Sequence, residues 1–290
     1  MHSNWEVGSN EVAVVVESAD RADSPTWIAF YLFVTTLWTL FLVSVPVITE
    51  VGPDNYYADH PGWYTGNDVM RFIEPVGGLM LNFLIFYKSG IMKPNMTRNE
   101  VACVTAFIFA ASLYVQGAGF HSAAITFKNS LERVADDQYD DNEYGPLHFY
   151  MRTVWEHGAS HYIYAAGYAL MQAAQLYAYR EVRYPEGSVT VLTKALLAGS
   201  GTLLGLLLLG VALQFPSGTI VGFIYLVLYG LFTVGGYHFY LYVYKGERKV
   251  LTEFGHLLVL HHFLLGYVLS FCALVLWLIV VGGFKSRSHE

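Results

Sequence analysis

The sequence predicts an all-α, polytopic membrane protein: one bundle of seven transmembrane helices with its N-terminus in the cytosol. Composition and segment length predict the class. The 290-residue chain is 54% hydrophobic and only 13% charged, whereas soluble domains are about one quarter charged. Seven apolar stretches approach or exceed the roughly 20 residues that a helix needs to cross a bilayer. They are about Trp27–Ile48, Met70–Tyr87, Val101–Ala123, Phe149–Tyr179, Val189–Gln214, Thr219–Tyr244 and His256–Val281.

The segments outside these spans are short, which predicts a single domain. Residues 1–24 are polar and mixed, as expected of a flexible cytosolic N-terminal tail. Residues 25–284 form the seven-helix domain, and residues 285–290 form a short C-terminal tail. The turn Pro216-Ser217-Gly218 predicts a tight hairpin between spans five and six. The two cysteines, Cys103 and Cys272, fall inside predicted spans and indicate apolar packing residues.

The distribution of basic residues predicts the orientation. Ten of the 16 Lys and Arg residues fall on the side of the N-terminus, and the loops on the other side are acidic. The positive-inside rule therefore places the N-terminus in the cytosol. On this topology the sequon Asn95-Met96-Thr97 is cytosolic and should not be glycosylated. A net charge of −7 argues against nucleic-acid partners and leaves the lipid bilayer as the expected surrounding.

Ionisable residues inside the predicted spans mark the candidate site. Glu74 lies near the outer end of span two, His121 near the end of span three, and Glu156, His157 and His161 near the start of span four. These ends meet in one leaflet, the exoplasmic one. Because ionisable groups are costly in a membrane, they usually face a cavity, a partner or a metal. His157 and His161 have i,i+4 spacing, so they share one helix face.

Three neutral imidazoles are a common way to hold Zn²⁺ with an open coordination position. The predicted metal ligands are His121, His157 and His161, and Glu156 or Glu74 is the predicted catalytic base. Such a zinc ion would lower the pKa of bound water and polarise a carbonyl group. The alternative reading is that these histidines form interhelical hydrogen bonds only.

Several small and polar residues near this site are expected to have structural roles. Gly117, Gly119 and Gly158 would let helices approach closely enough to share ligands. Asn82 and Gln116 are expected to form interhelical hydrogen bonds rather than a site. Glu74 precedes Pro75 and could instead brace the kink that this proline introduces.

A second group of histidines lies at the predicted cytosolic face, and its role stays open at this point. No acidic residue accompanies the group inside the membrane, and the i,i+5 spacing of two of its members separates their rings. A structural role is therefore favoured, with a second metal or a haem as the alternative. The group consists of His238, His256, His261 and His262.

One motif resembles a known family. Phe120-His121, with Glu132 eleven residues after the histidine, is similar to the pattern of the CREST superfamily, which includes alkaline ceramidases and the progestin and adiponectin receptors. The resemblance implies a seven-helix, zinc-dependent hydrolase of lipid amides, with His121 and the His157/His161 pair as ligands. Gly117 stands where the family has serine, Glu132 replaces aspartate, and the HxxxH pair falls in span four rather than in the last span.

Three functions therefore compete. The first is an integral-membrane, metal-dependent hydrolase acting on a lipid through the His/Glu site. The second is a transmembrane electron carrier with bis-histidine haems, one near each face. The third is a transporter or receptor that uses the intramembrane polar residues for proton or ligand coupling. The sequence specifies neither the organelle nor the oligomeric state.

Overall fold

The protein is helical throughout the residues that the structure describes. The computed structural model describes residues 24–49, 65–134, 145–185, 187–236 and 254–286, and these contain no strand. This confirms the predicted all-α class. The helices are α2 (Pro25–Ile48), α3 (Gly66–Lys88), α4 (Arg98–Val134), α5 (Gly145–Tyr150), the π-helical η2 (Met151–Ser160), α6 (His161–Ala178), α7 (Val191–Gln214), α8 (Thr219–Tyr229), the π-helical η3 (Gly230–Gly235) and α10 (Leu258–Val280).

Five of these helices are long and apolar enough to cross a membrane, namely α2, α3, α4, α7 and α10. This is consistent with an integral, multi-pass membrane protein. The fourth expected span is also helical, because α5, η2 and α6 run without a break from Gly145 to Ala178. The sixth is described only from Thr219 to Gly236, since the rest of it lies outside the described residues.

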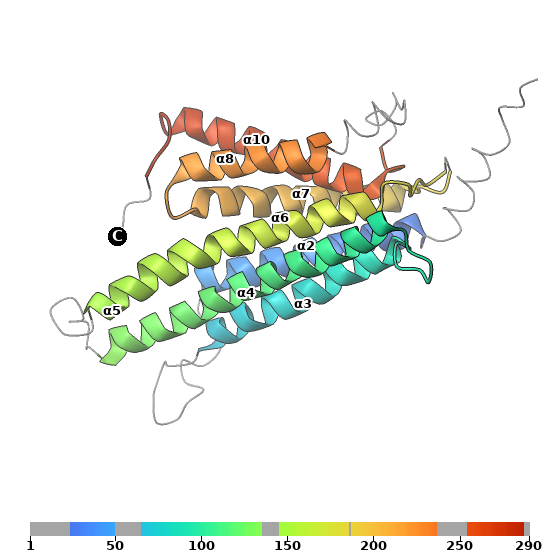
Figure 1. Cartoon of the computed structure of the whole chain (residues 1–290). Coiled ribbons are helices and arrows are strands. Elements are labelled where there is room, and N and C mark those ends of the chain that lie inside the picture. Colours follow the sequence, from blue (N-terminus) through green and yellow to red (C-terminus); the bar gives the residue numbers. More distant parts are fainter. Residues whose placement is uncertain (1–23, 50–64, 135–144, 186, 237–253, 287–290) are drawn as a thin grey trace, which may run out of the picture.

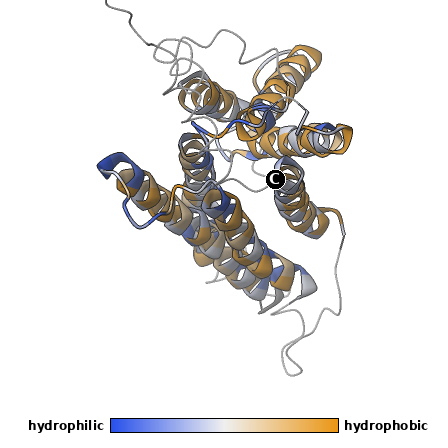
Figure 2. Ribbon diagram, turned by 90° about the vertical axis from the view of Figure 1, so that its right-hand side faces the viewer, coloured by the Kyte–Doolittle hydropathy of each residue, from blue (hydrophilic) through white to orange (hydrophobic). Residues whose placement is uncertain are grey.

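The helices form an elongated bundle with two parts (Figure 1). Helices α3, α4 and α6 pack together, and α2 joins them to α7. Helix α10 packs mainly against α7, and α8 lies beside both. Hydrophobic residues make up much of these helices (Figure 2), and many large apolar side chains among them are exposed, as expected of helices that face lipid.

Helix starts are fixed by short polar motifs. The Thr65 side chain accepts from the backbone N–H of Asp68 while the Asp68 side chain accepts from the backbone of Thr65, which is a capping box for α3. Thr97 and Glu100 make the same reciprocal pair at the start of α4, with distances of 3.3 and 2.7 Å. Gly218, with φ of +89°, forms the tight turn before α8 that the sequence predicts.

Helix α4 is longer than its predicted span. It has 37 residues, which at 1.5 Å per residue correspond to about 55 Å, against a hydrocarbon core of about 30 Å. The span was expected to end at Ala123, where the apolar run stops, but the helix continues to Val134 because no proline interrupts it. Together with α5, this end of α4 projects beyond the other helices (Figure 1).

Two glycines allow α4 and α6 to approach closely. A Cβ atom at Gly117 would lie 2.4 Å from the backbone nitrogen of Tyr164, and one at Gly167 would lie 2.3 Å from that of Tyr114. The expectation for Gly117 is therefore confirmed. It is wrong for Gly119, where a Cβ would meet nothing within 4 Å, and for Gly158, where it would meet only Thr153 of its own helical segment.

Candidate functional site

The three predicted ligand histidines lie near one another, where α4 faces the start of α6. The ring centroids of His121 and His161 are 5.0 Å apart. Those of His157 and His161 are 6.0 Å apart, with their planes perpendicular. All three side chains are partly exposed. The structure therefore brings together the three residues that sequence spacing placed in one leaflet.

Glu156 belongs to this group through an ion pair that sequence reasoning missed. Its carboxylate lies 3.3 Å from Lys128 Nζ and 3.4 Å from His157 Nε2. Lys128 lies beyond Ala123, where the predicted third span ends, so the sequence places it in a loop; in the structure it stands on the part of α4 that continues past Ala123. A search for helix-breaking residues after Ala123 would have found none and would have placed Lys128 on the helix.

A π-helical segment changes the geometry of these residues. Residues 151–160 form η2, in which backbone hydrogen bonds run from residue i to i+5. The sequence argument used α-helical spacing, in which Glu156 is rotated by roughly 100° from His157 and sits beside the histidine pair rather than in it. In η2 the Glu156 carboxylate lies beside both His157 and Lys128, and the Ser160 hydroxyl donates to the Glu156 carbonyl. Such wide turns occur frequently at functional sites.

The described residues do not gather a complete metal site. Within them, no three His, Cys, Asp or Glu side chains lie in an arrangement that could hold a metal ion. Glu156, the nearest carboxylate to the histidines, is already paired with Lys128. The predicted zinc ion therefore has no complete ligand set in this part of the chain, and the zinc assignment stays a prediction.

Glu74 forms a second group, separate from the histidines. It is 4% exposed, and its Oε1 accepts hydrogen bonds from the hydroxyls of Tyr114 at 2.6 Å and Tyr164 at 3.2 Å. Trp38 Nε1 donates to the Glu74 backbone carbonyl at 3.1 Å. The carboxyl is thus enclosed by α2, α4 and α6, and its hydrogen bonds go to tyrosines rather than to the predicted ligands.

The proline beside Glu74 also receives support from a neighbouring helix. Pro75 has no N–H, so the Arg71 carbonyl loses its usual intrahelical donor. The Ser122 hydroxyl of α4 lies 3.5 Å from that carbonyl and can donate to it. The bracing role considered for Glu74 is therefore filled in part by Ser122, which leaves the Glu74 carboxyl to the tyrosines.

A third polar layer follows along α3 and α6. Gln175 Nε2 donates to the backbone carbonyl and to Oδ1 of Asn82, both at 3.0 Å. The Tyr229 hydroxyl donates to Gln172 Oε1 at 2.6 Å. The expected interhelical role of Asn82 is confirmed, whereas Gln116 is exposed. Polar side chains therefore recur at three levels along the α3–α4–α6 seam, defined as the contact region of these three helices.

The histidines near the start of α10 bond to local groups. His256 Nδ1 lies 2.7 Å from the Tyr184 carbonyl, and His261 Nδ1 accepts from the Gly255 N–H at 3.1 Å. His262 Nδ1 lies 3.0 Å from Ser200 Oγ. These bonds favour the structural reading over a haem. His238 lies outside the described residues.

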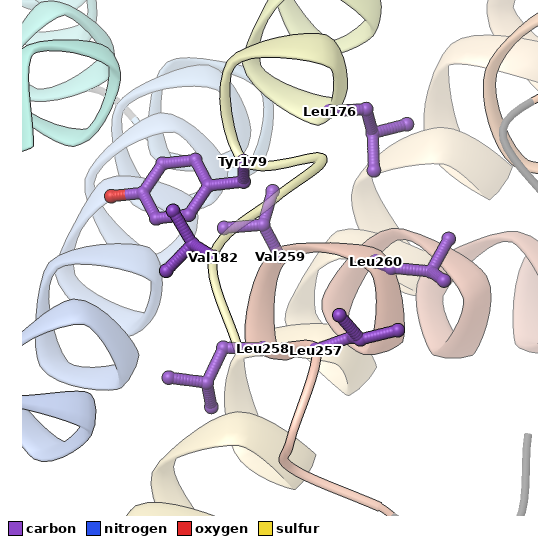
Figure 3. Close-up of a pocket in the computed structure, with 7 residues that line it drawn as sticks. All are labelled: Leu176, Tyr179, Val182, Leu257, Leu258, Val259 and Leu260. Carbon is purple, nitrogen blue, oxygen red and sulfur yellow. The ribbon is translucent and has the colours of Figure 1, made fainter. Parts of the chain in front are cut away.

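A small hollow also lies near this end of the bundle (Figure 3). It has room for little more than one water molecule, and six of its seven lining residues are aliphatic. The seventh is Tyr179, whose hydroxyl donates to the Ile85 carbonyl at 2.9 Å. With no carboxylate, imidazole or free donor in its wall, this hollow does not form a reaction site.

Comparisons with known proteins do not assign this chain to a family. No family model, no curated protein and no solved structure matches this chain. The resemblance to the CREST superfamily and the hydrolase activity that it implies therefore stay predictions.

Proposed function

We propose that this chain is a seven-span integral membrane protein, with its N-terminus in the cytosol, that takes up and releases protons within the bundle to drive transport or signalling. The observation that carries the proposal is the buried Glu74 carboxyl, enclosed by tyrosine hydroxyls in the middle of the α3–α4–α6 seam. Intramembrane carboxyls of this kind mark proton relays and ion pathways.

The surroundings of Glu74 favour a proton as its partner. An isolated carboxylate is very costly in an apolar interior, so such a group is neutralised or paired. Among the described residues, the groups that interact with Glu74 are Tyr114, Tyr164 and Thr39, and none of them carries a positive charge. A bound proton would remove the charge of Glu74 and leave its carbonyl oxygen free to accept from both tyrosines.

The neighbouring layers supply groups that exchange protons. At the projecting end of the seam, Glu156, His157 and Lys128 form a cluster of titratable groups in which His157 and Lys128 are partly exposed. Tyr164 stands one turn after His161 on α6 and reaches Glu74. The hydroxyl and imidazole groups thus lead from the partly exposed cluster toward the buried carboxyl. The basic residues on the N-terminal side support the proposed orientation.

The direct test is infrared difference spectroscopy on the full chain in lipid, with pH as the variable. We expect a protonated carboxylic acid band that responds to pH and is absent from Glu74→Gln. Glu181→Gln is the matched control, because Glu181 is more than half exposed and forms an ion pair with its neighbour Arg180. A wild-type spectrum with no buried acid band, or a band that survives in Glu74→Gln, would contradict the proposal.

A metal-dependent lipid hydrolase is the second candidate, because the rings of His121 and His161 are close enough to bind the same metal ion. Elemental analysis and a visible absorption spectrum on one purified sample test it. Stoichiometric zinc that disappears in His157→Ala would favour hydrolysis. A Soret band would favour the electron-carrier alternative, and a sample with neither result would exclude both.

A further inference from the structure

The three buried threonines of α2 differ in the hydrogen bonds of their hydroxyl groups, and one of them could contact a ligand. Thr35 and Thr36 donate to carbonyls one turn earlier in their own helix, at 2.7 and 2.8 Å. This is the usual arrangement for a threonine inside a helix. Thr39 has no exposed surface, and its Oγ1 makes no hydrogen bond with the described residues. The hydroxyl lies near the Glu74 carboxyl, in a geometry that falls short of a regular hydrogen bond.

Gly78 makes room for the Tyr114 hydroxyl beside the same carboxyl. A Cβ at Gly78 would lie 2.5 Å from the Tyr114 hydroxyl and 3.5 Å from Glu74 Oε1. Any larger residue at position 78 would therefore displace Tyr114 from Glu74. Three neighbouring helices thus bring hydroxyl oxygens to the Glu74 carboxyl of α3: Thr39 from α2, Tyr114 from α4 and Tyr164 from α6.

We propose that these four oxygen-bearing side chains form a binding site for a small monovalent cation, Na⁺, which exchanges with the proton on Glu74. The proposal rests on the proton-handling role of Glu74 and names the second ion that the same carboxyl binds. The ligand set contains oxygen only, which suits hard cations. Thr39 Oγ1 accepts no hydrogen bond from the described residues, so its lone pairs are available to an ion.

Charge selects a monovalent ion. The site holds one carboxylate, so Na⁺ gives a neutral buried complex, whereas Ca²⁺ or Mg²⁺ would leave a net positive charge in an apolar interior. The titratable groups that face Glu74 from the surrounding helices are Tyr114, Tyr164 and Tyr168, all of them tyrosines. Proton and Na⁺ therefore compete for one negative charge, and Na⁺ should bind less tightly as the pH falls.

The test measures the thermal stability of the full chain in lipid nanodiscs against NaCl, with KCl and choline chloride at equal ionic strength. A ligand that binds only the folded state raises the melting temperature. We expect NaCl to raise it above the choline value, by less at low pH. Where Glu74 is protonated, the apparent affinity should fall about tenfold for each unit of pH. Equal curves in NaCl and choline chloride would overturn the inference.

Two conservative variants separate this site from general salt effects. Thr39→Val removes the hydroxyl while keeping the shape of the side chain, and it should reduce the Na⁺ effect severalfold. Thr36→Val is the matched control on the same helix, and it should keep the wild-type response. An Na⁺ effect that persists unchanged in Thr39→Val would overturn the assignment. If Na⁺ has no effect while the infrared band of Glu74 still responds to pH, only this inference fails; if the band is also absent, the proton proposal fails with it.

Discussion

Two helix contacts in this molecule both contain glycines but differ chemically. In the α3–α4–α6 seam, glycines bring α4 and α6 together, and polar groups are shared between helices. In the α7–α10 contact, Gly201, Gly205 and Gly266 also allow close approach, but they face leucine side chains. Ser200 and His262 are the polar pair there. Close packing by itself therefore does not explain the polar layers, and this difference supports a functional role for the seam.

The largest difference should come from adding a methyl group to each contact. A Cβ at Gly167 would meet the backbone of α4, at 2.3 Å from Tyr114 N and 2.8 Å from Ala110 O. A backbone cannot move aside easily, so Gly167→Ala should cost about 3 kcal/mol of unfolding free energy. At Gly266 the nearest atoms are Leu204 Cδ2 and Cγ, both at 2.7 Å. A side chain can shift further than a backbone, so Gly266→Ala should cost less, about 2 kcal/mol.

Thermal unfolding of the purified variants measures both effects. Gly119→Ala is the control on α4, because its Cβ would meet nothing within 4 Å. This variant should be neutral or stabilising by up to about 1 kcal/mol, since alanine favours helix. Equal losses for Gly167→Ala and Gly266→Ala would mean that the two contacts tolerate added volume equally.

The second prediction removes a hydroxyl from the seam. Tyr114→Phe leaves Glu74 with one tyrosine donor instead of two, and it should destabilise the protein by about 2 kcal/mol. Tyr162→Phe is the control, because the Tyr162 hydroxyl bonds to Ser217 at an exposed position. Its loss should be within about 0.5 kcal/mol. A neutral Tyr114→Phe variant would show that the hydrogen bond to Glu74 does not stabilise the seam.

The α7–α10 contact should respond less to the loss of its polar pair. Ser200→Ala removes the partner of His262 Nδ1 at 3.0 Å, and we expect a loss of about 1 kcal/mol. At 3.0 Å this bond has an ordinary length, whereas the 2.6 Å bond from Tyr114 to Glu74 is short, so the loss should be smaller than for Tyr114→Phe. The same unfolding measurement ranks the two variants, and the reverse order would remove the energetic distinction between the contacts.

Part of this arrangement could be predicted from the sequence. Apolar runs predicted the helical class. The proximity of His121 to the His157/His161 pair was also predicted, because the chain reverses direction between spans three and four and the end of one span lies at the same depth as the start of the other. The Asn82 hydrogen bond was also predicted, since a buried amide needs a partner. These predictions depend on local periodicity and chain reversal, which are both readable from the residues.

The remainder depends on features that periodicity does not encode. Tyr114 and Tyr164 were not singled out, because the chain has 22 tyrosines and their contact with Glu74 depends on how far Gly117 and Gly167 let α4 and α6 approach. The π-helical η2 has no sequence pattern that separates it from an α-helix. Lys128 was assigned to a loop because the predicted helix ended with the apolar run.

The smallest expected effect concerns the end of the seam that projects beyond the bundle. The side chains of Lys128 and Glu156 are 19% and 8% exposed, so water and salt reach the pair through Lys128 and weaken it. A double-mutant cycle with Lys128→Met and Glu156→Gln should give a coupling energy of about 0.5 kcal/mol that falls as salt is added. A coupling of several kcal/mol, insensitive to salt, would instead place Glu156 in an apolar surrounding comparable to that of Glu74. The two carboxyls of the seam would then both lie at membrane depth, and the contrast between its buried layer and its projecting end would disappear.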